Sequence, residues 1–332
     1  MHGKKMSVGV CGGRRHAASI GAVAAVGAAL ATPAEAVQKT WIGTSSNPSA
    51  NFWSTDTFWS PTGVPTASDD ALFNSTLTYG VRLGGTPNFE ANTVTVANGH
   101  VTWFYGGGLI SSLDITGSLG VGFLGTSPKL TISSTGIAVE AGSVSVGSSL
   151  GGVAELVLDG NSTLNAPTFN VGTGSSAGVL TLTAAPNGGL GGTPTLATTN
   201  FTLGGGTSGS LQSDAIPTAF PLIQIDNHLQ VNSTGTIIAD AGITTGSATI
   251  EGQFDRVSGG FLLMTVANQL TWNTTDGLTA SEEIRGSVVD LQSNLALAGG
   301  ALSYSSFSGP GSLVWTSGAL LDTDGLSING LN

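Results

Sequence analysis

Short runs in which apolar and polar residues alternate recur along the chain at a regular spacing. The clearest runs are Leu130-Thr131-Ile132, Leu156-Val157-Leu158 and Leu180-Thr181-Leu182. Each follows one of three Val-Gly pairs that are 25 positions apart, and these are Val121-Gly122, Val146-Gly147 and Val171-Gly172. Alternation with a period of two is the pattern of a β-strand that turns every second side chain toward a core. The segment 117–185 therefore predicts three copies of one all-β unit.

A repeat of this length, built from strands and glycine-rich corners, is typical of stacked coils that share one continuous core. Repeats that contain helices need long runs of Ala, Leu, Glu and Lys, which this chain lacks. Disorder is disfavoured because hydrophobic residues make up 40% of the sequence, many of them in alternating register. The pattern predicts an all-β fold, a right-handed parallel β-helix.

The alternation continues on both sides of these repeats. Further strands are expected at 94–96, 101–103, 113–115, 220–225, 229–231, 235–238, 248–250, 261–266, 312–315 and 326–328. The period slips once, because the next similar pair, Leu203-Gly204, comes 32 positions after Val171-Gly172. The segment 186–194, rich in Gly and Pro, is interpreted as a loop inserted between coils, and the β-helix is expected to occupy 74–332.

The stretch 279–297 fits two different elements. Thr279 and Glu282 match a helical capping box. Gly286 would interrupt such a helix, and Leu295-Ala296-Leu297 before two glycines is typical of another coil. Strand is favoured, and helix is the alternative. The apolar positions with helical spacing are Ile284, Val288, Leu291 and Leu295.

The first 36 residues have the order of an export signal. A basic start precedes an apolar run over 17–31 and the small-x-small sequence Ala34-Glu35-Ala36. The apolar run is shorter than the roughly 20 residues that a membrane span needs. We expect cleavage before Val37 and export through the Sec pathway to the exterior or the cell surface, with the periplasm and, because of Arg14-Arg15, the twin-arginine route as alternatives.

Aromatic residues concentrate in 37–73, directly after that signal. They are Trp41, Phe52, Trp53, Phe58, Trp59 and Phe73. This composition predicts an amino-terminal cap that closes the open apolar end of the stack, because repeat proteins need capping units. The alternative is a platform on which Trp53 and Trp59 stack against sugar rings, since an indole offers a flat apolar face and one polar group.

The motifs of this region also resemble the start of autotransporter-type passengers and related exported β-solenoids, including those with autotransporter-associated β-strand repeats. Those chains begin with W-x-G, a second Trp, a Val-Pro turn and a D-x-A-x-F strand. The resemblance implies an exported β-solenoid and says little about a ligand. The matching segments here are Trp41-Ile42-Gly43, Phe58-Trp59-Ser60, Val64-Pro65 and Asp70-Ala71-Leu72-Phe73.

Charge and cysteine content narrow the expected partners. The formal net charge is −11, and without residues 1–36 the chain keeps 5 basic and 19 acidic residues, a net charge of −14. This small number of cations disfavours nucleic acid and anionic membranes as partners. A membrane contact is therefore expected only through export or a carboxyl-terminal anchor beyond this sequence. Cys11, the one cysteine, lies within the signal, so no disulfide, thiolate metal site or cysteine nucleophile is expected in the mature chain.

The sequence offers few candidate residues for catalysis or metal binding. β-Helix enzymes that act on polysaccharides need converging acids, or calcium with a basic residue. His100 and His228 are isolated, Asp69-Asp70 suit a turn, and Asp276 with Glu282-Glu283 suits a solvated charge group. The five cations beyond the signal stand in no motif of those enzymes, so no catalytic residue, metal or cofactor is expected. These cations are Lys39, Arg82, Lys129, Arg256 and Arg285.

The patterns together indicate an exported structural or adhesive β-solenoid, the rod or passenger part of a surface or secreted protein. Its expected partners are surface glycans or host or matrix molecules. Two other classes stay open: a non-catalytic carbohydrate-binding module that uses Trp53 and Trp59, and a β-helix polysaccharide lyase or glycoside hydrolase.

Overall fold

A computed structural model describes most of the chain from Ala36 to Ile328, and all the described residues belong to the unit Glu35–Asn332. The expected export signal, apart from Ala36, and most of the expected loop 186–194 lie outside the described residues. The described ranges are 36–43, 51–84, 88–105, 111–122, 127–134, 136–148, 152–184, 192–213, 221–258, 260–315 and 320–328.

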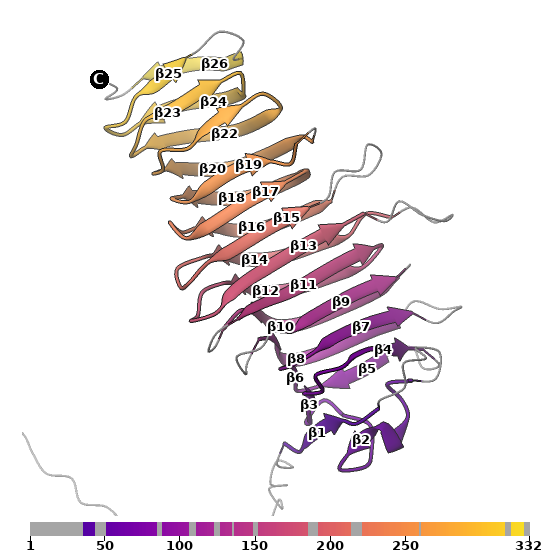
Figure 1. The fold of residues 1–332 in the computed structure, drawn as a ribbon. Coiled ribbons are helices and arrows are strands. Elements are labelled where there is room, and N and C mark those ends of the chain that lie inside the picture. Colours follow the sequence, from indigo (N-terminus) through magenta and orange to yellow (C-terminus); the bar gives the residue numbers. More distant parts are fainter. Residues whose placement is uncertain are drawn as a thin grey trace, which may run out of the picture. The chain divides into compact units, whose positions relative to one another are not determined.

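The longer strands lie side by side in one sheet, called sheet A (Figure 1). Two short strands, β5 (Asn88–Ala91) and β6 (Thr93–Val96), pair with the two halves of the first long one, β8 (Ser111–Val121). All these pairs are parallel. The long strands that follow are β10 (Ile137–Val146), β12 (Thr163–Val171), β14 (Thr195–Leu203), β16 (Leu222–Val231), β18 (Ala241–Ile250), β20 (Leu262–Trp272), β22 (Glu282–Leu291), β24 (Ala301–Ser308) and β26 (Leu320–Ile328).

Shorter strands alternate with the long ones along the chain and form two further parallel sheets. Since consecutive strands of one sheet are separated by a strand of another, the chain winds as coils, and the expected parallel β-helix is confirmed (Figure 1). Sheet B contains β4 (Thr78–Leu83), β7 (His100–Tyr105), β9 (Lys129–Ser134), β11 (Val153–Gly160), β13 (Ala177–Thr183), β15 (Gly209–Ser213), β17 (Gly235–Ala239) and β19 (Gln253–Arg256), and sheet C contains β21 (Gly277–Thr279), β23 (Leu295–Ala298) and β25 (Leu313–Trp315).

Each long strand bends near its middle, which divides sheet A into two faces. In β10 the buried positions fall at Ile137, Val139 and Ala141, skip Gly142 and Ser143, and resume at Val144. The pairing register with β8 shifts at the same place. We call the first halves of the long strands face 1, the second halves face 2, and the outer side of the short strands face 3.

Identical positions of successive coils stack into buried columns. The column at the end of face 2 is apolar throughout, and burying each such side chain stabilises the fold by about 1.5–3 kcal/mol. Because neighbours above and below do the burying, stability is a property of the stack. The column contains Val96, Val121, Val146, Val171, Leu203, Val231, Ile250, Trp272 and Leu291.

Glycine is required directly after that column in the regular repeats. Gly122, Gly147, Gly172 and Gly204 all have a positive φ, between 66° and 103°. Each donates its N–H to the carbonyl of the column residue one coil earlier, as from Gly172 to Val146 at 2.8 Å. A Cβ on Gly172 would lie 1.7 Å from the Ser208 carbonyl oxygen. The Val-Gly period in the sequence is therefore the mark of one corner of the coil.

Later coils make the same corner without glycine. Asn232, Glu251, Asn273 and Gln292 donate their N–H groups to the equivalent carbonyls at 2.8–2.9 Å. These coils are also shorter, with 19 residues between the corners at 232 and 251.

The strands expected from alternation are present. The stretch 279–297 contains β22 and β23, so the helix alternative is wrong. The suspected capping pair does make the contact that its spacing suggests, because the Glu282 carboxylate accepts the Thr279 N–H at 2.5 Å. It does so in a tight turn between strands, where Ser281 has a φ of 70°.

The amino-terminal end is closed by an aromatic cap. β1 (Gln38–Trp41) pairs in parallel with β3 (Asp70–Phe73) and antiparallel with β2 (Trp59–Ser60). The indole rings of Trp41 and Trp59 pack edge to face, with their centroids 5.0 Å apart. The ring of Trp53 packs edge to face on that of Trp103 in the following coil, with their centroids 6.2 Å apart. Phe73 is fully buried among them, so the aromatic rings of the cap continue into the core of the stack.

Candidate functional site

The two tryptophans proposed as a sugar platform are buried. Trp53 is 0% and Trp59 1% exposed, and the Trp59 indole N–H donates to the Trp53 carbonyl at 2.9 Å. Neither ring has a face on the surface, so the stacking hypothesis for these residues is wrong. Phe52 and Phe58 are half-buried, and the Arg82 guanidinium lies 4.9 Å from the centre of the Phe52 ring.

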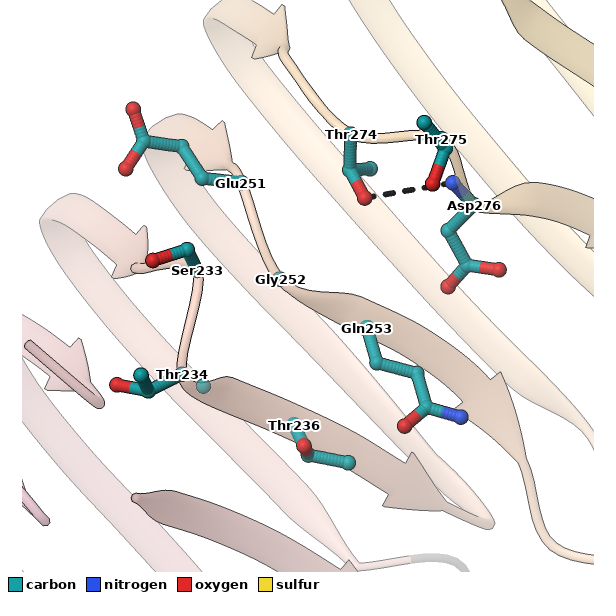
Figure 2. A pocket seen from close by; sticks show the side chains of 10 residues that line it. Ser233, Thr234, Thr236, Glu251, Gly252, Gln253, Thr274, Thr275 and Asp276 are labelled. Atoms are coloured by element: carbon teal, nitrogen blue, oxygen red, sulfur yellow. Dashed lines mark hydrogen bonds between the residues drawn. The ribbon is translucent and has the colours of Figure 1, made fainter. Parts of the chain in front are cut away.

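A polar groove lies at the corner that leads from face 2 to face 3 in the coils of β17, β19 and β21 (Figure 2). Its volume is about 500 Å³. Hydroxyl groups dominate the lining, with one side-chain amide and two carboxylates. The lining residues are Ser233, Thr234, Gly235, Thr236, Glu251, Gly252, Gln253, Thr274, Thr275 and Asp276.

Two glycines let successive coils approach closely in this groove. A Cβ on Gly252 would lie 2.1 Å from the Gly235 carbonyl oxygen, and one on Gly235 would lie 2.7 Å from the carbonyl of Leu203. Side chains at these two positions would push the coils apart. Because neither glycine has a side chain to fill the space at this corner, a hollow is left there, and the hydroxyl groups of neighbouring residues line it.

Asp276 is the lining residue most tightly held by its surroundings. Its carboxylate accepts the N–H of Phe254 at 2.6 Å and that of Gly277 at 3.0 Å, while its own N–H donates to the Thr274 hydroxyl at 3.3 Å (Figure 2). Burial raises the pKa of the Asp276 carboxyl above its ordinary value, although the two N–H donors oppose this, and the neighbouring charges of Asp255 and Glu282 raise it further.

The groove presents hydroxyl, amide and carboxylate groups, but its two carboxylates are not arranged as an acid pair for catalysis. Glycoside hydrolysis needs two carboxyl groups that flank one bond. Figure 2 shows the carboxylates of Glu251 and Asp276 pointing in different directions, and that of Asp276 is already engaged by two backbone donors. This geometry favours binding over acid–base chemistry.

The same region contains a discontinuity between sheets B and C. The N–H groups of Phe254 and Arg256 on β19, which would otherwise meet the carbonyls of a next strand, donate to the carboxylates of Asp276 and Glu282 at 2.6 and 3.0 Å. Glu282 is 1% exposed, so its interpretation as part of a solvated charge group is wrong. Side-chain carboxylates here replace the backbone ladder.

A second hollow, of about 410 Å³, lies on face 3 beside His100, Lys129 and Glu155. The ammonium of Lys129 is 2.9 Å from the Glu155 carboxylate, and the Thr181 hydroxyl donates to the same carboxylate at 3.3 Å. His100 is exposed and neighbours Lys129 in the strand register. Such a half-exposed ion pair at the surface contributes little to stability.

A third hollow, of about 320 Å³, follows the bend between faces 1 and 2, next to a column of carboxylates. Glu90, Asp114 and Glu140 stack on three successive strands without a basic neighbour in that column. Among the described residues, no group of three or more histidine, cysteine, aspartate or glutamate side chains is arranged to hold a metal ion.

Asp69 has the turn role expected of it, whereas Asp70 begins strand β3 and bonds to side chains of the next coil. The Asp69 carboxylate accepts the Thr66 N–H at 3.0 Å and its hydroxyl at 2.8 Å. Asp70 accepts hydrogen bonds from the Asn92 amide and the Thr93 hydroxyl of the next coil, at 2.9 and 2.7 Å.

The polar groove itself was not predicted, since its lining is an ordinary mixture of turn residues. Its one signal is the recurrence of Ser, Thr and Gly at corners of neighbouring coils.

No family model, curated protein or solved structure matches the chain. In the part of the chain that the structure describes, no helix has the length and apolar character needed to cross a membrane.

Proposed function

We propose that the protein is an exported structural or adhesive β-solenoid, the rod or passenger part of a surface or secreted protein. The single observation that carries this proposal is the uninterrupted stack from β3 to β26, in which each long strand pairs only with the strands of adjacent coils. Such a stack produces a long outer surface whose side chains repeat at the strand spacing of about 4.8 Å. A repeating surface suits contact with extended partners.

The sequence of the first 36 residues and the resemblance of 41–73 to autotransporter-type passengers support the export part of the proposal. The first described strand, β1, begins at Gln38, directly after the expected cleavage site before Val37. Extended glycan or matrix molecules on the cell exterior are the partners that this proposal requires.

Cell fractionation with sequencing of the mature amino terminus tests the proposal. We expect the protein outside the inner membrane, beginning at Val37, and we expect its deletion to reduce attachment of cells to surfaces. Retention in the cytoplasm with an intact amino terminus would contradict export, and unchanged attachment after deletion would contradict the adhesive role.

A further inference from the structure

Face 2 differs from the other faces in carrying no charge over most of its length. Its central outward positions form one column over eight neighbouring strands of sheet A, from β6 to β20. We call it the uncharged column. The column contains Thr95, Gly120, Ser145, Asn170, Thr202, Gln230, Thr249 and Thr271. The next residue in register, Asp290 on β22, is its first charge.

A second column beside it, nearer the bend, is also without a formally charged residue. Its members include Ser118, Ser143, Asn200, His228 and Ser247, with histidine counted as neutral. Up to β20, the charges of the described coils lie outside these two columns: the carboxylate column is on face 1, and the Lys129–Glu155 pair is on face 3. In a chain with a net charge of −11, this separation makes face 2 the surface with the least electrostatic preference.

The uncharged column also has free hydrogen-bonding capacity. The side chains of Ser145, Asn170, Thr202, Thr249 and Thr271 are half-buried, and within the described part of the chain they make no side-chain hydrogen bond to another residue. Hydroxyls and amides both donate and accept. By the strand spacing, the column extends over roughly 34 Å in steps of about 4.8 Å.

From these observations we infer that face 2 is the binding surface for a neutral, linear glycan that lies along the stack. A charged polymer gains nothing from a surface without charge, whereas the hydroxyl groups of a neutral glycan match the donors and acceptors of the column. Each contact is weak, and repetition over many coils supplies the affinity. The inference rests on the proposed adhesive function and names its ligand class and its surface.

One strand provides a matched pair of variants. Thr249 and Thr244 both lie on β18 and point outward, Thr249 in the uncharged column and Thr244 on face 1. Their neighbours in register are uncharged in both cases: Gln230 and Thr271 beside Thr249, and Gln224 and Thr265 beside Thr244. A glutamate at either position therefore meets uncharged neighbours in register, although Thr249 is half-buried and Thr244 is exposed.

The experiment measures retention of the purified full chain on cellulose, chitin and mannan, with polygalacturonate as the anionic comparison. We expect retention on at least one neutral polymer, none on polygalacturonate, and affinity for soluble oligosaccharides of that polymer that increases with their length. Thr249→Glu should reduce retention at least tenfold, and Thr244→Glu should change it less than twofold. Matching unfolding curves of the two variants would show that both fold.

Retention on none of the neutral polymers would overturn the inference, as would equal losses in the two variants or preferential binding of polygalacturonate. Sedimentation that shows self-association abolished by Thr249→Glu would assign face 2 to a second copy of the chain instead. Failure of export or attachment in cells, with Thr249-dependent glycan retention intact in vitro, would reject the proposed function and leave the binding surface standing.

Discussion

Replacement of Gly172 by alanine tests whether the corner glycines are required by geometry. Gly172 has a φ of 66°, where an L-residue is strained by about 1–2 kcal/mol. The added Cβ would lie 1.7 Å from the Ser208 carbonyl oxygen. That oxygen accepts the Gly178 N–H at 2.9 Å, so moving it away weakens a hydrogen bond worth about 0.5–1.5 kcal/mol. Together these costs predict a loss of about 1.5–3.5 kcal/mol in the free energy of unfolding.

Two other glycines separate the contributions of strain and contact. Gly299 has a φ of 93°, but the nearest atom to an added Cβ is 3.6 Å away, so Gly299→Ala should cost only the strain, about 1–2 kcal/mol. Gly242 lies on β18 with nothing within 4 Å of an added Cβ and no positive φ. Gly242→Ala should stabilise the strand by about 0.5–1 kcal/mol.

Urea unfolding followed by far-ultraviolet circular dichroism gives the three free energies. The expected order of stability is Gly242→Ala, wild type, Gly299→Ala and Gly172→Ala, from highest to lowest. If Gly172→Ala unfolded at the same urea concentration as Gly242→Ala, the stacking of coils at this corner would not be as close as described.

Three further changes test the core and the discontinuity between sheets B and C by the same unfolding measurement. Leu156→Asp should destabilise the fold by several kcal/mol, roughly the cost of burying an unpaired charge, whereas Thr131→Asp on the outer side of β9 should have little effect; equal losses would mean that the inward and outward assignments are wrong. Glu282→Gln should lower the free energy of unfolding by about 1–3 kcal/mol, because its amide NH₂ would face a backbone N–H donor. Glu283→Gln, at a more exposed neighbouring position, should lower it much less. Similar losses in the two variants would reject the capping role of Glu282. Because the pKa of Asp276 is raised in the folded state, ionisation of its carboxyl opposes folding. The free energy of unfolding should therefore gain from this group as the pH falls from neutral toward the ordinary range of carboxyl pKa values. Asp276→Asn should flatten this pH dependence of stability, and an unchanged pH profile would contradict the raised pKa.

The sequence was most informative where the coils are regular. Val121-Gly122 and its two repeats identified both the apolar column and the corner, because a positive φ admits glycine and few other residues. Alternation then assigned the strands and their inward side chains correctly, including Leu156.

The signal faded where other residues make the same corner. Asn232 and Glu251 donate the same hydrogen bond as the corner glycines, so no Val-Gly pair marks the shorter coils. Glu282 was also misread, because its burial depends on the adjacent coil of Arg256, which no local pattern reveals.

The surface features could not be predicted for a related reason. The polar groove and the uncharged column both depend on which residues stack above one another, and that register varies with each coil length. Thr202 and Thr249 are 47 positions apart in the sequence, yet only Gln230 separates them in the column. Burial of Trp53 and Trp59 likewise follows from the packing of the cap on Trp103.

The two ends of sheet A are not equivalent. At one end β1 and β2 form an antiparallel pair, and at the other, within the described residues, β26 pairs only with β24. A coil that packs against the capped end finds one of its two open apolar faces already covered, so the cap offers a ready surface on which neighbouring coils can stack. If the chain is exported amino terminus first, as proposed, each coil that folds on the cap outside the membrane would hinder backward movement of the chain.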